Sequence, residues 1–209
     1  MTRIAIAMYD EMTMLDAIGP YQVLTWLPGA EVVLVGAARG RITDDRGLLH
    51  VDIEHTFDDV PHPDVLVVPG GFVTRTMAVA GNPLVEWVRA AHPATTWTTS
   101  VCTGSLVLGA AGLLDGVDAT THWSAYDALA SFGAHPTEER VVVRGKVITG
   151  AGVSAGIDMA LRLVIEMAGV EVAQAIQLGI EYDPQPPVHA GSPSTAPAEI
   201  VELVRAINR

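Results

Sequence analysis

Cysteine is nearly absent from this chain: a single one, at position 102, occurs among 209 residues. A disulfide within the chain needs two cysteines, so none can hold the fold together. Cysteine, histidine and carboxylate side chains do not cluster at metal-ligand spacing, and the glycine-rich fingerprints of phosphate and dinucleotide sites are missing. The sequence therefore predicts no cofactor and no metal.

Basic residues are also scarce, with 12 Lys and Arg against 24 Asp and Glu, which gives a net charge of −12. A surface of this charge repels phosphates and anionic membranes. The apolar run at residues 1–7 is too short for a signal peptide or a membrane span. We therefore expect a cytoplasmic protein that binds neither nucleic acid nor membrane.

Hydrophobic residues make up 49% of the chain, enough for one well-cored domain over residues 1–209. Buried strands alternate with amphipathic helices, which predicts an α/β fold with a mostly parallel central sheet and helices on both faces. The predicted strands are 3–9, 31–37, 48–53, 64–68, 97–101, a short one at 118–121 and a hairpin of 140–143 with 146–149. The predicted helices are one beginning near Asp16 and ending near 27, then 83–91, 106–114, 122–132, a long one after 150–156, and 170–178.

The C-terminal part has a different character. Residues 183–197 are rich in proline and lack apolar periodicity, so we expect an extended segment, followed by a short helix at 198–208. The extended segment is apolar in places and needs a surface to lie on, which a second copy of the chain can supply.

The segment around Cys102 predicts a strand, a sharp turn and a helix. A β-branched run at 97–101 ends at Cys102, and an apolar helical pattern begins at Leu106. A nucleophile on such a turn, a nucleophile elbow, stands clear of the sheet, and the free N–H groups of the next helix can favour a thiolate. The alternative is a buried structural cysteine.

Three features fall at the carboxyl ends of predicted strands, where sites gather in such folds: Asp16, Gly70-Gly71 and Cys102. Together a thiolate, a carboxyl group and free N–H groups of Gly71 and Thr103 would supply a nucleophile, a proton carrier and a cradle for negative charge. Each has a simpler alternative. Asp16 can be a helix N-cap, the glycine pair a tight turn, and His122 an interior histidine or another N-cap.

Several motifs resemble the ThiJ/PfpI superfamily, which is related to class I glutamine amidotransferase domains. They are Val-Val-Pro-Gly-Gly at 67–71, Cys-Thr-Gly-Ser-x-x-Leu-Gly-Ala-Ala-Gly-Leu-Leu-Asp-Gly at 102–116 and Ala-Thr-Thr-His-Trp at 119–123. With Leu-Asp-Ala-Ile-Gly-Pro at 15–20, the chain is most similar to the isocyanide (isonitrile) hydratases of that superfamily. The resemblance covers essentially the whole chain and implies a flavodoxin-like three-layer sandwich and a homodimer.

The resemblance also implies roles for single residues. Cys102 would be the nucleophile, Asp16 the acid that most members supply as glutamate, and the N–H groups of Thr103 and Gly71 would face the reacting atoms. Thr103 stands where protease-like members have histidine, which argues against a hydrolase with an adjacent Cys-His pair. The residues expected to contact the substrate are Gly70, Phe72, His122 and Trp123.

The function that follows is hydration of an isocyanide to an N-substituted formamide, with Cys102 as the nucleophile and Asp16 as general acid and base. Two alternatives stay open. One is a glyoxal or other carbonyl hydratase or deglycase that uses the same nucleophile. The other is a detached ligand or redox sensor, because similar domains form the amino-terminal part of AraC-type regulators.

Overall fold

The apolar runs of the sequence form one seven-stranded sheet in the computed structural model, which describes residues 1–207. Continuous apolar strands are typical of a sheet covered on both faces, and all four residues of β6 are buried. Every pairing in the sheet is parallel except that of β10 with β11. In spatial order the strands are β10 (Val141–Arg144), β11 (Val147–Gly150), β7 (Trp97–Val101), β6 (Val65–Val68), β1 (Thr2–Ala7), β2 (Ala30–Gly36) and β5 (His55–Thr56).

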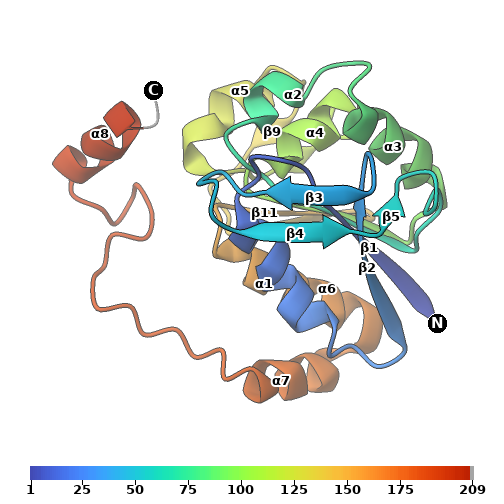
Figure 1. Ribbon diagram of the computed structural model, residues 1–209. Coiled ribbons are helices and arrows are strands. Elements are labelled where there is room, and N and C mark those ends of the chain that lie inside the picture. Colours follow the sequence, from blue (N-terminus) through green and yellow to red (C-terminus); the bar gives the residue numbers. More distant parts are fainter. Residues whose placement is uncertain (208–209) are drawn as a thin grey trace.

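Helices cover both faces of this sheet, as the sequence predicts (Figure 1). Side chains of β1 alternate between two cores: Ile4 and Ile6 face one, Ala5 and Ala7 the other. The first core is covered by α1 (Met14–Leu24), α6 (Ala155–Ala168) and α7 (Val170–Gly179). The second is covered by α3 (Pro83–Ala91), α4 (Gly104–Ala110) and α5 (Tyr126–Ala130), with α2 (Thr74–Met77) beside them.

The start of α1 differs from the prediction. The helix begins at Met14, with Thr13 in the N-cap position, so Asp16 lies inside the first turn and is not the cap. Pro20 lies in the helix interior, where it cannot donate a hydrogen bond to the carbonyl of Asp16. Pro20 is buried, and its ring lies close to Gly156 of α6.

Other elements differ in extent. The predicted strand 48–53 is shorter, as β4 (His50–Ile53), and pairs with the unpredicted β3 (Gly40–Thr43) in a separate hairpin. The predicted helix 122–132 is a 3₁₀ turn at Trp123–Ala125 followed by α5. Two short strands, β8 (Asp118–Ala119) and β9 (His135–Pro136), pair beside it.

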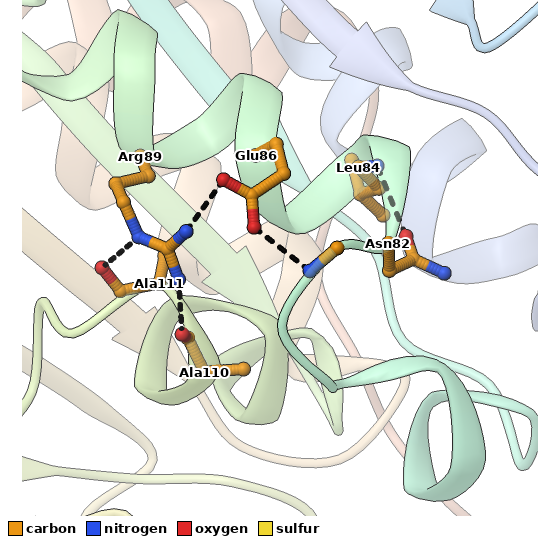
Figure 2. Close-up of polar contacts among 7 residues, drawn as sticks. Asn82, Leu84, Glu86, Arg89, Ala110 and Ala111 are labelled. Atoms are coloured by element: carbon orange, nitrogen blue, oxygen red, sulfur yellow. Dashed lines mark hydrogen bonds and ion pairs between the residues drawn. The ribbon is translucent and has the colours of Figure 1, made fainter.

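Polar contacts fix α3 against the end of α4, the helix that follows Cys102 (Figure 2). Asn82 caps α3 by accepting a 3.0 Å hydrogen bond from the N–H of Leu84. Arg89 pairs with Glu86 and donates to the carbonyl groups of Ala110 and Ala111, where α4 ends. These bonds satisfy carbonyls that have no partner within their own helix, and they hold α4 in place.

The C-terminal segment runs extended from the end of α7 to α8 (Ala198–Ile207), as predicted (Figure 1). No residue of α8 is buried, and its contact with the body includes Arg205, whose guanidinium lies 5.8 Å from the ring centre of Trp123. The predicted end of this helix at 208 lies outside the described residues. None of the helices within residues 1–207 is long and apolar enough to cross a membrane.

Candidate active site

Cys102 occupies a sharp turn between β7 and α4. Its φ of 57° lies in the left-handed region, which costs an ordinary residue about 1–2 kcal/mol. Its N–H donates to the carbonyl groups of Gly150 and Ala151, at 3.0 and 2.9 Å, and these bonds hold the strained conformation. The predicted order of strand, sharp turn and helix is therefore present, and the side chain is only 5% exposed.

Glycines allow the loops after β6 and β7 to approach each other closely. A Cβ on Gly70 would lie 2.5 Å from the Thr103 nitrogen, and one on Gly104 would lie 2.1 Å from the Val68 carbonyl oxygen. Neither Gly70 nor Gly71 has a positive φ. Close approach of backbone, and not the tight turn considered as the alternative, is therefore the reason for glycine at these positions.

Thr103 and Gly71 join the two loops through a reciprocal pair of hydrogen bonds. The N–H of Gly71 donates to Thr103 Oγ1 at 3.0 Å, and that hydroxyl donates to the carbonyl of Gly71 at 2.9 Å. The prediction of a free N–H at Gly71 is therefore wrong, because the Thr103 hydroxyl already accepts from it. The N–H and the hydroxyl of Thr103 lower the pKa of the Cys102 thiol. The expectation that this N–H faces the reacting atoms stays a prediction.

Asp16 lies behind Cys102 and is fully buried. Its Oδ2 accepts a 2.9 Å hydrogen bond from the N–H of Gly70, while its Oδ1 has no hydrogen-bond partner among the described residues. Burial raises the pKa of Asp16 to about 7, against the lowering effects of the Gly70 N–H and the Cys102 thiol. The carboxyl group can therefore give or take a proton near neutral pH.

The Cys102 thiol is not ionised at rest. Burial, and then the charge of Asp16, raise its pKa to about 12, although the N–H groups of Val153 and Thr103 and the Thr103 hydroxyl oppose the shift. The N–H of Thr103 does favour a thiolate, as the sequence predicts, but burial and the charge of Asp16 outweigh its effect on the pKa of Cys102. Near pH 7 the pair consists of a thiol beside a carboxyl group that is about half ionised.

A cavity of about 250 Å³ opens in front of Cys102. Of the residues expected to contact the substrate, Phe72 and His122 line it, and Gly70 and Trp123 do not. Gly70 is buried against Thr103 and holds Asp16 instead, and Trp123 lines a neighbouring cavity that shares His122. The lining residues are Thr13, Asp45, Arg46, Gly71, Phe72, Arg75, Cys102, Thr103, His122, Ser124 and Val153.

His122 is an N-cap, as the simpler alternative proposed. Its Nδ1 accepts a 3.3 Å hydrogen bond from the N–H of Ser124 and lies 2.8 Å from Ser124 Oγ. Burial and the charge of Arg75 lower the pKa of His122, so the ring is neutral near pH 7. A neutral ring at the edge of the cavity contributes shape and a polar nitrogen without a charge.

Sequence reasoning missed two groups at this site. The hydroxyl of Tyr9 donates to the carbonyl of Pro69 at 2.6 Å, and burial together with the charges of Asp16 and Cys102 raises its pKa, so it stays neutral. Arg75, on the single-turn helix α2, reaches the cavity and was missed because no motif marks it. Within residues 1–207, no three His, Cys, Asp or Glu side chains are grouped so that they could hold a metal ion.

The sheet order and the strained cysteine in the turn after β7 define a flavodoxin-like α/β protein with that cysteine at the carboxyl edge of the sheet. The chain belongs to the DJ-1/PfpI family, whose model matches residues 2–166. It is 43% identical over 97% of its length to an isonitrile hydratase of Pseudomonas putida, of which it covers 88%. A crystal structure of a ThiJ/PfpI family protein from Pseudomonas syringae superposes with a TM-score of 0.92 at 42% identity, over 99% of this chain and 87% of that one.

A regulator is also similar to part of the chain. The HTH-type transcriptional regulator CdhR of Pseudomonas aeruginosa is 32% identical over 67% of this chain, which corresponds to 41% of the regulator. The similarity to the hydratase thus extends over nearly the full length of both proteins, whereas the similarity to the regulator covers less than half of that protein.

Proposed function

We propose that this protein is an isocyanide hydratase, which converts R–N≡C and water into an N-substituted formamide. The observation that carries the proposal is the buried pair of Cys102 and Asp16, whose carboxyl group has a pKa of about 7 beside a protonated thiol. The isocyanide carbon accepts a nucleophile readily only when a proton is supplied as the bond forms. The similarity to the P. putida hydratase supports the same chemistry.

The first step is addition of the thiol. The Asp16 carboxylate takes the proton from Cys102 as the sulphur attacks the terminal carbon, and the resulting acid gives the same proton to that carbon. The product is the thioimidate Cys–S–CH=N–R, and no proton is gained or lost by the protein. The Thr103 N–H stabilises the negative charge on sulphur while the proton is on Asp16.

The second step is hydrolysis of the thioimidate. Asp16 removes a proton from the attacking water and delivers it to nitrogen, which leaves the intermediate Cys–S–CH(OH)–NH–R. The C–S bond then breaks as the hydroxyl proton passes through Asp16 to sulphur, and the formamide leaves with the thiol restored. Gly71 contributes to both steps indirectly, because its N–H and its carbonyl group hydrogen-bond to the hydroxyl of Thr103 and so hold Thr103 beside Cys102.

The test is formamide production, followed by NMR, from a panel of neutral isocyanides. Wild type should turn over, and Cys102→Ala and Cys102→Ser should not, while circular dichroism shows both variants folded. Retained turnover in either variant would contradict the covalent mechanism. Glyoxal is the comparison substrate: turnover of glyoxal without turnover of any isocyanide would favour the carbonyl hydratase instead.

We also propose that the protein acts as a homodimer in the cytoplasm, on a small molecule and without a nucleic-acid partner. The C-terminal segment supports the dimer, since α8 buries no residue against its own body while Leu203 and Ile207 are 55% and 73% exposed. Light scattering at micromolar concentration should give twice the mass of one chain. A mass of one chain would contradict the dimer.

A further inference from the structure

The arginines of this chain divide into two groups. Eight of those within residues 1–207 form an ion pair with an acidic side chain: Arg3, Arg39, Arg41, Arg89, Arg140, Arg144, Arg162 and Arg205. Arg46 and Arg75 form none within that part of the chain, and both line the cavity in front of Cys102. In a protein with twice as many acidic as basic residues, two such arginines at one cavity point to an anionic ligand.

From this arrangement we infer that the substrates are isocyanides whose R group carries a carboxylate, and that Arg75 binds this carboxylate. The inference rests on the proposed hydratase function and names its substrate class. With the isocyanide carbon at the Cys102 sulphur, the substituent extends into the cavity that Arg75 lines. A short isocyanide carboxylate thus places its carbon at Cys102 and its carboxylate at Arg75 within one cavity.

Arg75 is held in place for this role. Its Nη2 donates to the Oγ and the carbonyl of Ser124, at 2.9 and 3.3 Å, and its guanidinium lies 4.5 Å from the ring centre of Phe72. The donors on Nη1 and Nε have no acceptor within residues 1–207, although a guanidinium presents five N–H groups in a planar fork. A fixed guanidinium with free donors matches a carboxylate and loses little entropy on binding it.

The other charged groups at the cavity are compatible with an anion. Arg46 is exposed, on the loop between β3 and β4, and adds a second positive charge at the rim. Asp45 carries the opposing charge, and its Oδ2 already accepts a 3.1 Å hydrogen bond from the Thr13 hydroxyl. His122 is neutral near pH 7, so it neither attracts nor repels the ligand.

The experiment compares isocyanoacetate with its methyl ester, which has the same reacting group and a similar size but no charge. The measured quantity is the ratio of kcat/KM for the acid to kcat/KM for the ester. We expect a ratio above one for wild type, lowered about 10- to 100-fold in Arg75→Gln, as expected for loss of a hydrogen bond between charged groups. Arg46→Gln, at the rim, should lower it less.

Arg41→Gln is the matched control, because it removes the same charge from an exposed arginine that does not line this cavity. Its ratio should equal that of wild type. If Arg75 served only to position Ser124 and His122, Arg75→Gln would slow both substrates alike and leave the ratio unchanged, which would overturn the inference. A wild-type ratio below one would overturn it as well.

The two proposals fail in different ways. If the enzyme hydrates the ester while the ratio is insensitive to Arg75, the hydratase stands and the carboxylate preference falls. If neither isocyanide is hydrated, the hydratase itself falls. Raised ionic strength gives an independent readout, since it should increase KM for the acid and have a smaller effect on KM for the ester.

Discussion

The backbone N–H of Gly70 holds the carboxyl group of Asp16 through a 2.9 Å hydrogen bond between the loop after β6 and the first turn of α1. The bond fixes one oxygen and leaves the other, Oδ1, without a partner beside the Cys102 thiol. The carboxyl group is therefore oriented by the backbone, and its proton affinity is set by burial.

The first prediction concerns the pH dependence of catalysis. The proposed reaction needs Asp16 ionised while Cys102 keeps its proton, and the pKa values are about 7 and about 12. On these values kcat/KM for a neutral isocyanide should rise as pH increases through about 7 and then reach a plateau. Initial rates from pH 5 to 9 test this. Activity that falls across that range would show that the protonated carboxyl group is the active form.

The second prediction concerns stability. The pKa of Asp16 is about 7 in the folded protein and 3.8 for an ordinary aspartate, so the folded state binds the proton more tightly. Wild-type stability should therefore decrease as pH rises from about 4 to about 7, by up to about 4 kcal/mol from this group. Asp16→Asn cannot ionise, so it should be more stable than wild type at pH 8, with the gain absent at pH 4. Urea unfolding at both pH values measures the difference.

Asp44→Asn provides a control with the opposite sign. The N–H groups of Leu48 and Leu49 hydrogen-bond to Asp44 and lower its pKa. Its contribution to stability is present above the ordinary pKa and lost as pH falls, so Asp44→Asn should destabilise the protein at pH 8 more than at low pH. If both variants respond alike to pH, the raised pKa of Asp16 is not the cause.

The third prediction concerns the bridge between Thr103 and Gly71. Thr103→Val removes the hydroxyl and leaves the buried N–H of Gly71 without a partner, which should cost about 1–3 kcal/mol of unfolding free energy. The Gly71 carbonyl keeps its hydrogen bonds from the N–H and the hydroxyl of Thr74. Thr103→Ser keeps the hydroxyl and should recover most of this loss and most of the activity. Chemical denaturation and initial rates of the two variants provide the comparison. Equal loss in both would show that the hydroxyl does not carry the effect, since Thr103→Ser retains it.

The fourth prediction concerns close packing at Gly70. In Gly70→Ala the new Cβ would lie 2.5 Å from the Thr103 nitrogen and 2.8 Å from its Oγ1, so the loops after β6 and β7 must separate. We expect the unfolding free energy to fall by about 2 kcal/mol or more. We also expect a large loss of activity, because the Gly70 N–H would move away from Asp16. Gly191→Ala is the control, because a Cβ on Gly191 would have no atom within 4 Å. It should change neither the unfolding free energy nor the activity. A fully active Gly70→Ala would refute this account of the site.

The sequence predicts much of this architecture because its signals are local. The apolar run ending at Val68 and the β-branched run ending at Val101 become adjacent parallel strands, and the turn at Cys102 follows directly. Asp16 and Cys102 meet because parallel strands end at one edge of the sheet. Local patterns therefore predict both the fold and the meeting of Asp16 and Cys102 at one edge of the sheet.

The remaining features depend on contacts between distant segments. Nothing near Asp16 in the sequence indicates that its partner is Gly70, so a helix cap was the simpler prediction. The local pattern also favours a thiolate at Cys102, but the burial and negative charge contributed by other elements outweigh that effect. Arg75 is missed because its function depends on Ser124, which reaches it only in the folded chain.

The buried carboxyl group of Asp16 also gives the protein an internal spectroscopic probe. When Asp16 is protonated on Oδ1, its carbonyl oxygen is Oδ2, which accepts a single hydrogen bond from the Gly70 N–H, and the C=O stretch of such an acid lies far from the infrared bands of ionised carboxylates. Burial raises the pKa of Asp16 to about 7, so the band of a protonated carboxyl group that appears and disappears around that pH is assigned to it. Its amplitude reports the position of a single proton during turnover, without a label and without substitution of any residue.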